Sequence, residues 1–522
     1  MTTKNIFIAS VFMLTAIGFS SCKDELAEIK TLNVDRAFSP TDLKTAIINK
    51  TSVRLTWDKV RNAETYTVEF FANGDMDFSG SPFKVVEGVK FGDLPLTVRG
   101  FAGATSYSVR VKAIGEGIED SKYVSATFST DPEQIFLPVN QSKIETKSAV
   151  LNWTPGENAT KIVLAPGDIE HLVTADEIAA GEATVTGLSG ETFYTAKLME
   201  GDNIRGTTTF TTLLDLSTAI QVSPSDNLVS LIAGASGGET FALLPGTYNI
   251  NADVAITKSI SIKGYKPSDK PIINGMVFRL KSTVGLKLQD LILDGTGNTS
   301  NNQTVVYDED DLVNVYAPFI MQDCEVKNYV KGLYYVNKKA LIESTTFKGN
   351  IIHDIVCDGG DFIDYRAGLS KTFLFENNTV YNSANTARDF FRMDSGGATN
   401  FPAATSNITI TANTLFNVSN SNSKRILYIR LGKSAPITFT KNILANTDAY
   451  YTNQSSTEIN AFENNNYFNA PNFTASDVKD AKNDASTSKT ALDPGFLSPT
   501  TGVFTISNLT LINNGIGAAR WR

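Results

Sequence analysis

A ten-residue pattern that recurs in the C-terminal half most strongly constrains what this 522-residue chain can fold into. Most copies are an apolar-x-apolar triplet followed by Asn or Asp, and successive copies start 22 to 35 residues apart. Self-similarity on this scale is typical of a solenoid, in which each repeat forms one coil and stacks on the next. The copies start at Leu286, Phe319, Leu341, Phe373, Ile408, Ile437 and Asn460.

The Asn residues of this pattern predict a ladder at a turn. Equivalent positions of stacked coils lie above one another, so amide side chains can hydrogen-bond from coil to coil. We therefore expect a structural role for these amides, which are Asn377, Asn378, Asn413, Asn442, Asn464 and Asn465.

Composition supports an all-β protein of two to four domains. Asn, Thr and Ser are abundant, predicted strands are short, and segments with helical periodicity are almost absent. The formal charge is −9, from 46 basic and 55 acidic residues, and no run of Lys or Arg occurs. Nucleic-acid binding needs a concentrated positive surface, so we expect no nucleic-acid partner.

The N-terminus has the pattern of a targeting segment. Lys4 precedes an apolar stretch, residues 6–19, that is too short to span a bilayer comfortably. Ser20-Ser21-Cys22 resembles the lipobox of bacterial lipoproteins, which implies lipidation of Cys22, and the acidic residues at 24 and 25 resemble surface-export signals. The expected location is the outer membrane, lipid-anchored and exposed at the cell surface. The alternative is an ordinary signal peptide with an incidental Cys.

Two segments with alternating strands follow a tether at residues 22–34. In the first, at 35–131, Trp57 lies in an early strand and Tyr107 before a late one. In the second, at 132–215, Trp153 and Tyr194 repeat that spacing. This resembles the fibronectin type III sandwich, in which such a Trp is buried and the Tyr forms a tyrosine corner.

From residue 216 the pattern changes. TFALLPGTYNINADVAITKSISIKGY resembles the first coils of pectate-lyase-like right-handed parallel β-helices, and the tail from Asp493 to Trp521 is expected to cap the last coil. The whole chain resembles Bacteroidota-type surface lipoproteins with fibronectin type III-like domains and a pectin-lyase-like β-helix. The resemblance implies glycan utilisation alongside other proteins of that process. It divides the chain into a signal peptide 1–21, tether 22–34, sandwiches 35–131 and 132–215, and β-helix 216–522.

Four charged and aromatic segments in successive coils predict a site on the outer face. They are residues 332–337, 361–366, 389–394 and 425–430. Stacked about 4.8 Å apart with side chains alternating between faces, they give outer columns that mix Asp, Arg and aromatic rings. The two polar columns are Tyr335, Asp364, Arg392, Tyr428 and Asn337, Arg366, Asp394, Arg430, and the flanking apolar column is Leu333, Phe362, Phe390, Ile426.

An acidic polysaccharide suits such a surface. Guanidiniums pair with uronate carboxylates, carboxylates can hold Ca²⁺, and aromatic faces stack on sugar rings. Resemblance to polysaccharide lyases of this fold implies β-elimination, with an arginine as base. The resulting assignments are Arg366, Arg392 and Arg430 as catalytic, Asp364 and Asp394 as metal ligands, and Tyr335, Phe362, Phe390 and Tyr428 as substrate-binding.

Several alternatives stay open. Asp358, Asp361 and Asp364 crowd one segment, as in hydrolases of this fold, but the accompanying hydrolase motifs are absent from the sequence. The charged columns also fit a non-catalytic glycan-binding face, or a purely structural ladder in an adhesive or structural protein. The acidic segment 308–313 is interpreted as a solvated loop, and Cys324 and Cys357 as small buried apolar residues.

Overall fold

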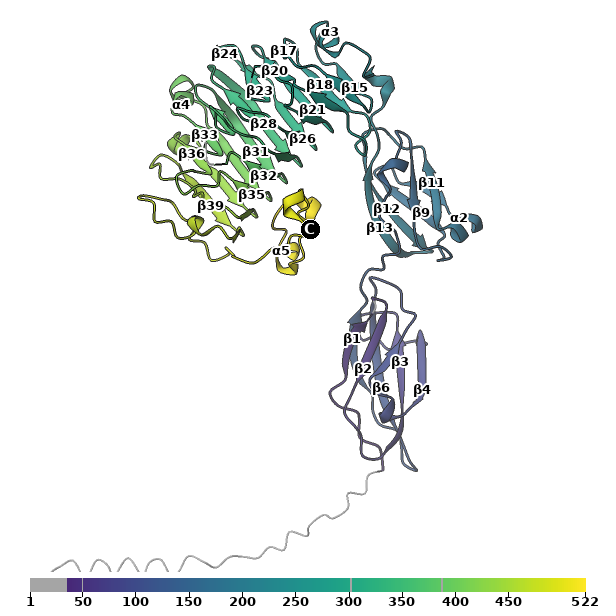
Figure 1. Ribbon diagram of the computed structural model, residues 1–522. Coiled ribbons are helices and arrows are strands. Elements are labelled where there is room, and N and C mark those ends of the chain that lie inside the picture. Colours follow the sequence, from purple (N-terminus) through teal and green to yellow (C-terminus); the bar gives the residue numbers. More distant parts are fainter. Residues whose placement is uncertain (1–34, 49, 301–302, 386–387) are drawn as a thin grey trace, which may run out of the picture.

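The structure is a computed structural model that describes residues 35–48, 50–300, 303–385 and 388–522. The predicted signal peptide, lipidation site Cys22 and tether lie outside the described residues. The chain is all-β, as the composition predicted: two antiparallel sandwiches are followed by a large stack of parallel strands (Figure 1). Within the described residues, no helix is long and apolar enough to cross a membrane.

The first sandwich packs a three-stranded sheet on a four-stranded one around a single apolar core. The smaller sheet has the order β1 (Lys44–Ile48), β2 (Ser52–Thr56), β5 (Leu96–Val98). The larger has the order β4 (Lys84–Val89), β3 (Ala63–Phe71), β6 (Ser106–Gly115), β7 (Val124–Ser129).

The second sandwich pairs β8 (Ser148–Asn152) with β11 (Glu182–Thr186) and packs this ribbon on a four-stranded sheet. Helix α2 (Ala175–Ala180) precedes β11 and has a capping box from Thr174. The four-stranded sheet has the order β10 (Ile169–Leu172), β9 (Lys161–Ala165), β12 (Phe193–Glu200), β13 (Asn203–Thr211).

Both sandwiches have the two features that the sequence predicted. Trp57 and Trp153 are buried in the two cores. The Tyr107 hydroxyl accepts a hydrogen bond from the backbone N–H of Ala102, and Tyr194 accepts one from Ser189, each five residues upstream. A tyrosine hydroxyl that binds the backbone just upstream is the tyrosine corner, so in these features both sandwiches are fibronectin type III-like.

The remaining described residues form three parallel sheets, and most coils give one strand to each. We call this β-helix-like region the coil stack. The eleven-stranded sheet contains β14 (Ile220–Val222), β15 (Thr240–Leu243), β18 (Ile260–Gly264), β21 (Leu286–Gln289), β25 (Phe319–Gln322), β28 (Ala340–Lys348), β31 (Leu369–Glu376), β34 (Asn407–Thr411), β37 (Ile437–Thr440) and β39 (Ile459–Glu463), with β24 (Asp311–Tyr316) beside β28.

The other two sheets use shorter strands. The nine-stranded sheet contains β16 (Thr247–Asn249), β19 (Ile272–Asn274), β22 (Ile292–Asp294), β26 (Glu325–Lys327), β29 (Ile351–His353), β32 (Thr379–Ser383), β35 (Thr414–Val418), β38 (Ile443–Ala445) and β40 (Asn466–Phe468). The seven-stranded sheet contains β17 (Asp253–Ile256), β20 (Val277–Leu280), β23 (Val305–Tyr307), β27 (Tyr334–Val336), β30 (Ile363–Tyr365), β33 (Phe391–Met393) and β36 (Leu427–Ile429).

The three sheets enclose one continuous apolar core. Cys324 and Cys357 are free thiols buried in it, as the sequence predicted. Three short helices lie outside the sheets: α3 (Leu228–Ala233), α4 (Gly396–Asn400) and α5 (Leu509–Asn513).

The predicted Asn ladder is confirmed at one turn of the coil stack. The side-chain oxygen of each buried amide accepts a hydrogen bond from the backbone N–H of the equivalent residue in the preceding coil. Its side-chain nitrogen donates a hydrogen bond to a backbone carbonyl oxygen of that same coil. The ladder comprises Asn350, Asn378, Asn413, Asn442 and Asn465.

Two predicted members are not in the ladder, and one true member was missed. Asn377 and Asn464 instead precede ladder residues and have left-handed backbone, with φ of 56° and 55°, which Asn tolerates well. Asn350 was missed because the copy predicted to start at Leu341 is shifted by four residues. In the structure, Phe319 pairs with Thr345, not Leu341, and the triplet ending at Phe347 is the one that stacks.

The tail does not cap the last coil as predicted. It folds back along the outer face of the nine-stranded sheet, where Phe504 and Ile506 cover Phe416 and Ile443 in a second apolar cluster. That face carries apolar side chains that need cover, whereas the predicted end-capping position would leave them exposed.

Candidate functional site

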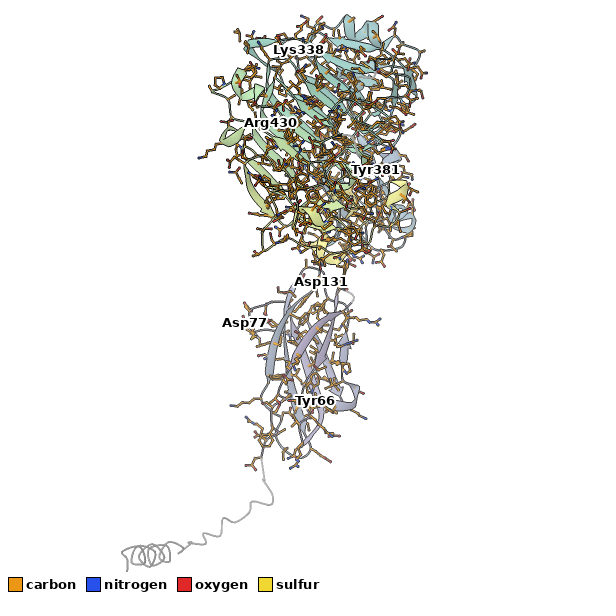
Figure 2. All side chains as sticks on the ribbon, turned by 60° about the vertical axis from the view of Figure 1, so that its left-hand side comes forward. Tyr66, Asp77, Asp131, Lys338, Tyr381 and Arg430 are labelled. Carbon is orange, nitrogen blue, oxygen red and sulfur yellow. The ribbon has the colours of Figure 1, made fainter. Side chains whose placement is uncertain are left out.

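The outer face of the seven-stranded sheet has the register that the repeat predicted. Tyr335 in β27 pairs with Asp364 in β30, Asp364 with Arg392 in β33, and Arg392 with Tyr428 in β36. The first polar column of the sequence analysis is therefore confirmed. With strands about 4.8 Å apart, it runs about 14 Å from Tyr335 to Tyr428. Arg430 marks this side of the coil stack in Figure 2, where Tyr381 of the nine-stranded sheet lies on a different side.

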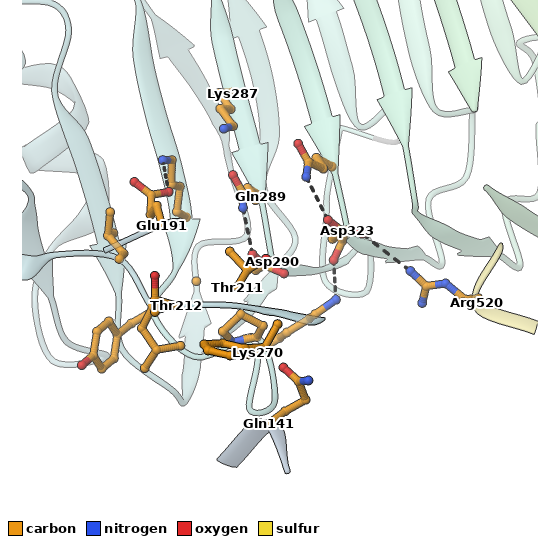
Figure 3. A pocket seen from close by; sticks show the side chains of 18 residues that line it. Gln141, Glu191, Thr211, Thr212, Lys270, Lys287, Gln289, Asp290, Asp323 and Arg520 are labelled. Carbon is orange, nitrogen blue, oxygen red and sulfur yellow. Dashed lines mark hydrogen bonds and ion pairs between the residues drawn. The ribbon is translucent and has the colours of Figure 1, made fainter. Parts of the chain in front are cut away.

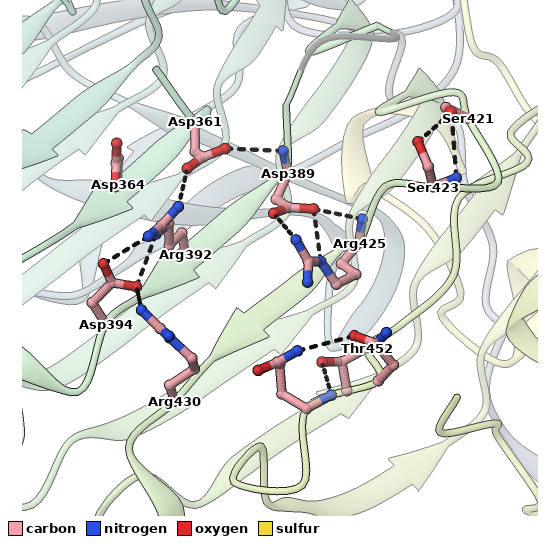
Figure 4. Close-up of polar contacts among 12 residues, drawn as sticks. Asp361, Asp364, Asp389, Arg392, Asp394, Ser421, Ser423, Arg425, Arg430 and Thr452 are labelled. Atoms are coloured by element: carbon pink, nitrogen blue, oxygen red, sulfur yellow. Dashed lines mark hydrogen bonds and ion pairs between the residues drawn. The ribbon is translucent and has the colours of Figure 1, made fainter. Parts of the chain in front are cut away.

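Eight charged residues form one connected network around this column, which we call the charge array. Arg366 binds Asp364 through two hydrogen bonds, of 2.5 and 2.9 Å. Arg392 binds both oxygens of Asp394 at 2.8 Å, and Arg430 adds a third contact to Asp394 at 2.6 Å (Figure 4). The array consists of Asp361, Asp364, Arg366, Asp389, Arg392, Asp394, Arg425 and Arg430.

Two buried carboxylates of the charge array also bind the backbone. Asp361 accepts a hydrogen bond from the backbone N–H of Asp389 at 3.0 Å, and Asp389 accepts one from Arg425 at 2.8 Å (Figure 4). These two aspartates start equivalent segments in successive coils, so the same bond repeats along the stack. They therefore fix the corner that leads into β33 and β36, in addition to any role toward a ligand.

The carboxylates lie beneath the guanidiniums. Asp361 and Asp364 are 2% and 1% exposed, whereas the four arginine side chains are 18% to 33% exposed. Tyr428 lies among three of these guanidiniums, whose carbons are 3.8 to 5.1 Å from its ring centroid. The layer that meets solvent is therefore cationic and aromatic.

The electrostatics of the charge array keep Arg366 and Arg392 protonated. Burial acts to lower the pKa of Arg366, but the hydrogen bonds and negative charge of Asp364 outweigh it and raise that pKa. Asp394 does the same for Arg392, whose pKa is also raised. A guanidinium with a raised pKa is a poor proton acceptor. The predicted role of Arg366 and Arg392 as catalytic base finds no support in this geometry.

Phe362 and Phe390 do not belong to the outer face, so their predicted role in stacking on sugars is wrong. They are 0% and 1% exposed and stack on each other inside the core, with ring centroids 4.7 Å apart. Leu333 and Ile426 are buried likewise. The four strands concerned, β27, β30, β33 and β36, are only three residues long, so these four residues precede the strands at a corner, where strict alternation no longer applies.

The two predicted metal ligands already have cationic partners. Arg366 binds both oxygens of Asp364, and Arg392 and Arg430 bind Asp394. Asp358, Asp361 and Asp364 do not form a free acid–base pair, since Arg366 contacts both Asp361 and Asp364. Among the residues that the structure describes, no group of three or more His, Cys, Asp or Glu could hold a metal ion.

Comparison with known proteins matches two family models to the coil stack. Residues 246–383 match a domain of unknown function, DUF4957, and residues 408–521 match a second domain of unknown function, DUF5123. No curated protein matches the chain.

Solved structures match the chain at low overall similarity. A two fibronectin type-III domain segment from chicken tenascin is 19% identical, covers 33% of this chain and 97% of its own, and has a TM-score of 0.22. The central fibronectin-III array of RIM-binding protein is 18% identical, covers 38% of this chain and 67% of its own, and has a TM-score of 0.15.

Three members of the charge array were not among the predicted site residues. Asp361 and Asp389 were seen as the first residues of the repeated segments, and Arg425 as the first residue of the next one, but none received a role. The sequence register could have identified them, because Asp361, Asp389 and Arg425 each lie two residues before a three-residue strand. Equivalent positions stack from coil to coil, which predicts contact between the Asp of one coil and the backbone of the next.

Proposed function

We propose that this protein is a lipid-anchored protein of the bacterial outer membrane that binds an extracellular, acidic polysaccharide at the cell surface. In this proposal Cys22 carries the lipid, and the fibronectin type III-like sandwiches hold the coil stack away from the membrane. The coil stack is a right-handed parallel β-helix of the pectin-lyase-like kind. The charge array, with Tyr335 and Tyr428, contacts the polysaccharide.

The observation that carries the proposal is the layering of the charge array. Buried carboxylates orient the guanidiniums from below, and each guanidinium has five N–H donors, of which the aspartates use only some. The remaining edges surround the ring of Tyr428. An oriented guanidinium loses little side-chain entropy on binding a carboxylate, so the surface is preorganised for uronate groups and sugar rings.

Binding fits this geometry better than cleavage. β-Elimination needs a base, and the arginines beside the column have raised pKa values. Burial also raises the pKa of Tyr335, so its phenol stays neutral. The lyase-like activity that the family resemblance implies, with Arg430 as the remaining candidate base and Ca²⁺ as neutralising cation, is the second candidate. A purely structural ladder is the third, favoured by the backbone bonds of Asp361 and Asp389.

The test uses Tyr428, at the end of the column, and Arg430, which lies beside its ring. Tyr428→Ala and Arg430→Gln remove a ring and a guanidinium without leaving a fully buried carboxylate unpaired, because Arg392 still binds Asp394. Retardation of the purified chain in gels with polygalacturonate should fall about tenfold in each variant, as expected for losing one stacking or charge-assisted contact. A neutral galactan gel should retard none of the proteins.

Tyr123→Ala is the matched control. Tyr123 in the first sandwich also stacks on an arginine, Arg110, at 4.2 Å, and is 38% exposed. This variant should retain full retardation. Parallel incubation with and without Ca²⁺, followed by ultraviolet absorbance of unsaturated sugar, separates binding from elimination. Equal retardation of wild type and both array variants would favour the structural ladder.

A further inference from the structure

A cleft of about 800 Å³ lies where the second sandwich meets the eleven-stranded sheet (Figure 3). One wall comes from residues 210–214, which include the end of β13, and the other from the outer face of β18, β21 and β25. Lys263 of β18 pairs with Glu191 of the second sandwich at 2.6 Å, which joins the two walls. The volume of the cleft is in the range of sites that bind small ligands.

Lys287 in β21 is the unusual cation of this cleft. Its side chain is partly buried, and burial followed by the charge of Lys263 lowers its pKa. Within the described residues, no group lies within hydrogen-bond or ion-pair distance of its ammonium, and no contact to it is drawn in Figure 3. A partly desolvated cation without a partner costs free energy, so Lys287 lowers the stability of the folded state.

Two acceptors lie next to this cation on the same strand end. Gln289 is two residues from Lys287, on the same face, so the two side chains start about 7 Å apart. The Gln289 side-chain oxygen is buried and has no hydrogen-bond partner among the described residues. Asp290 lines the cleft at 8% exposure and accepts a hydrogen bond from the Gln289 amide nitrogen at 3.1 Å.

The far end of the cleft combines a cation with another carboxylate. Arg520, delivered by the tail, lies 3.8 Å from Asp323, and Lys270 donates a hydrogen bond to the Asp323 carbonyl oxygen (Figure 3). Glu191, Asp290 and Asp323 would repel a multiply charged anion. The cleft therefore suits a ligand with one negative charge and several hydroxyl groups.

We propose that this cleft is a second binding site, separate from the charge array, for a single acidic sugar unit of the uronate class. The sugar carboxylate binds the Lys287 ammonium. When the Gln289 side chain turns toward the cleft, a sugar hydroxyl donates to its free oxygen, and a second hydroxyl donates to Asp290. The ligand thus supplies the partner that Lys287 lacks and the donor that Gln289 lacks.

Isothermal titration calorimetry of the purified full chain with D-galacturonate and D-galactose tests this assignment. Galacturonate should bind at least tenfold more tightly than galactose, because only the acid can pair with Lys287. Lys287→Met should weaken galacturonate binding about tenfold and raise the melting temperature, since it removes an unpaired cation. Gln289→Leu should weaken binding about fivefold.

Lys371→Met is the matched control. Lys371 lies on the same eleven-stranded sheet, is 39% exposed and pairs with Glu343, so this variant should bind galacturonate like wild type. Repeating the Lys287→Met comparison in an Arg430→Gln background removes a charge-array contact, which keeps this outcome independent of the polysaccharide test. The proposal fails if galacturonate does not bind, if galactose binds equally well, or if Lys287→Met binds as wild type does.

Discussion

The Asn ladder and the charge array are both columns of stacked side chains, but their polar groups find partners in different ways. In the ladder, identical neutral amides repeat from Asn350 to Asn465, and each both donates and accepts. In the array, stacked positions alternate in sign, as Asp364 and Arg392 do, and the guanidiniums reach solvent.

The difference shows which column can serve stability alone. An amide has donors and acceptors, so identical copies satisfy one another without a net charge. A carboxylate only accepts, so a column of aspartates needs cations at every level, and desolvating such pairs brings little net stability. A ladder of amides would have sufficed to hold this corner. This difference is why we propose that the exposed cations of the array serve a ligand.

The largest expected effect comes from breaking the ladder. Asn413→Leu preserves shape but leaves the Asn378 backbone N–H and the Phe375 carbonyl oxygen buried without partners. We expect the unfolding free energy of the coil stack to fall by about 4 kcal/mol, from several lost buried hydrogen bonds. Urea unfolding followed by hydrogen exchange of coil-stack amides measures it. Asn274→Leu, which loses one exposed bond to Asn249, should cost under about 1 kcal/mol.

Removing a deep carboxylate of the array should cost slightly less. Asp389→Ala leaves the Arg425 guanidinium, whose side chain is 20% exposed, without its partner and removes an acceptor for the Arg425 backbone N–H. The expected loss is about 3 kcal/mol in the same unfolding experiment. Asp389→Asn keeps the backbone acceptor and should recover part of this loss. If Asp389→Ala is neutral, the corner does not depend on the array.

At the surface of the array the effect on stability should be small. Arg430 is 33% exposed, and Asp394 keeps its bonds to Arg392 when it is removed. Arg430→Gln should therefore cost under about 1 kcal/mol, even though we expect it to weaken polygalacturonate binding. A melting temperature that falls as far as in Asp389→Ala would show that the array is a structural unit throughout.

The smallest expected effect is a pH dependence of stability that the charge array has and the Asn ladder lacks. Burial acts to raise the pKa of Asp394, but hydrogen bonds from Arg392 and Arg430 overcome it and lower that pKa below 3.8. The folded state therefore gains stability from this carboxylate above pH 3.8, and loses it as the pH falls through the lowered value. The stability difference between wild type and Asp394→Asn should shrink below pH 3.8. Asn413→Leu should show no such trend, because amides do not titrate.

The repeat predicted much of the coil stack because residues that are one repeat apart in the sequence lie next to each other in adjacent coils. The column from Tyr335 to Tyr428 and four ladder residues followed from period alone. Phe362 and Phe390 were misplaced because alternation was extended past strands of only three residues. The cleft was not predictable: Glu191, Lys287 and Arg520 come from three distant segments, and no local pattern links a sandwich turn, a coil and the tail.

The folded-back tail has a consequence for how the coil stack unfolds. Repeat arrays with contacts only between neighbours can open from one end, one repeat at a time. Here Trp521 donates to Thr379, Ala518 to Thr414, and Arg520 to the Gly349 carbonyl oxygen, so residues 518–521 of the tail bind three coils at once. The last coils cannot peel away without breaking these bonds. The stack should open in one cooperative step, because residues 518–521 hold coils that are distant from them in the sequence.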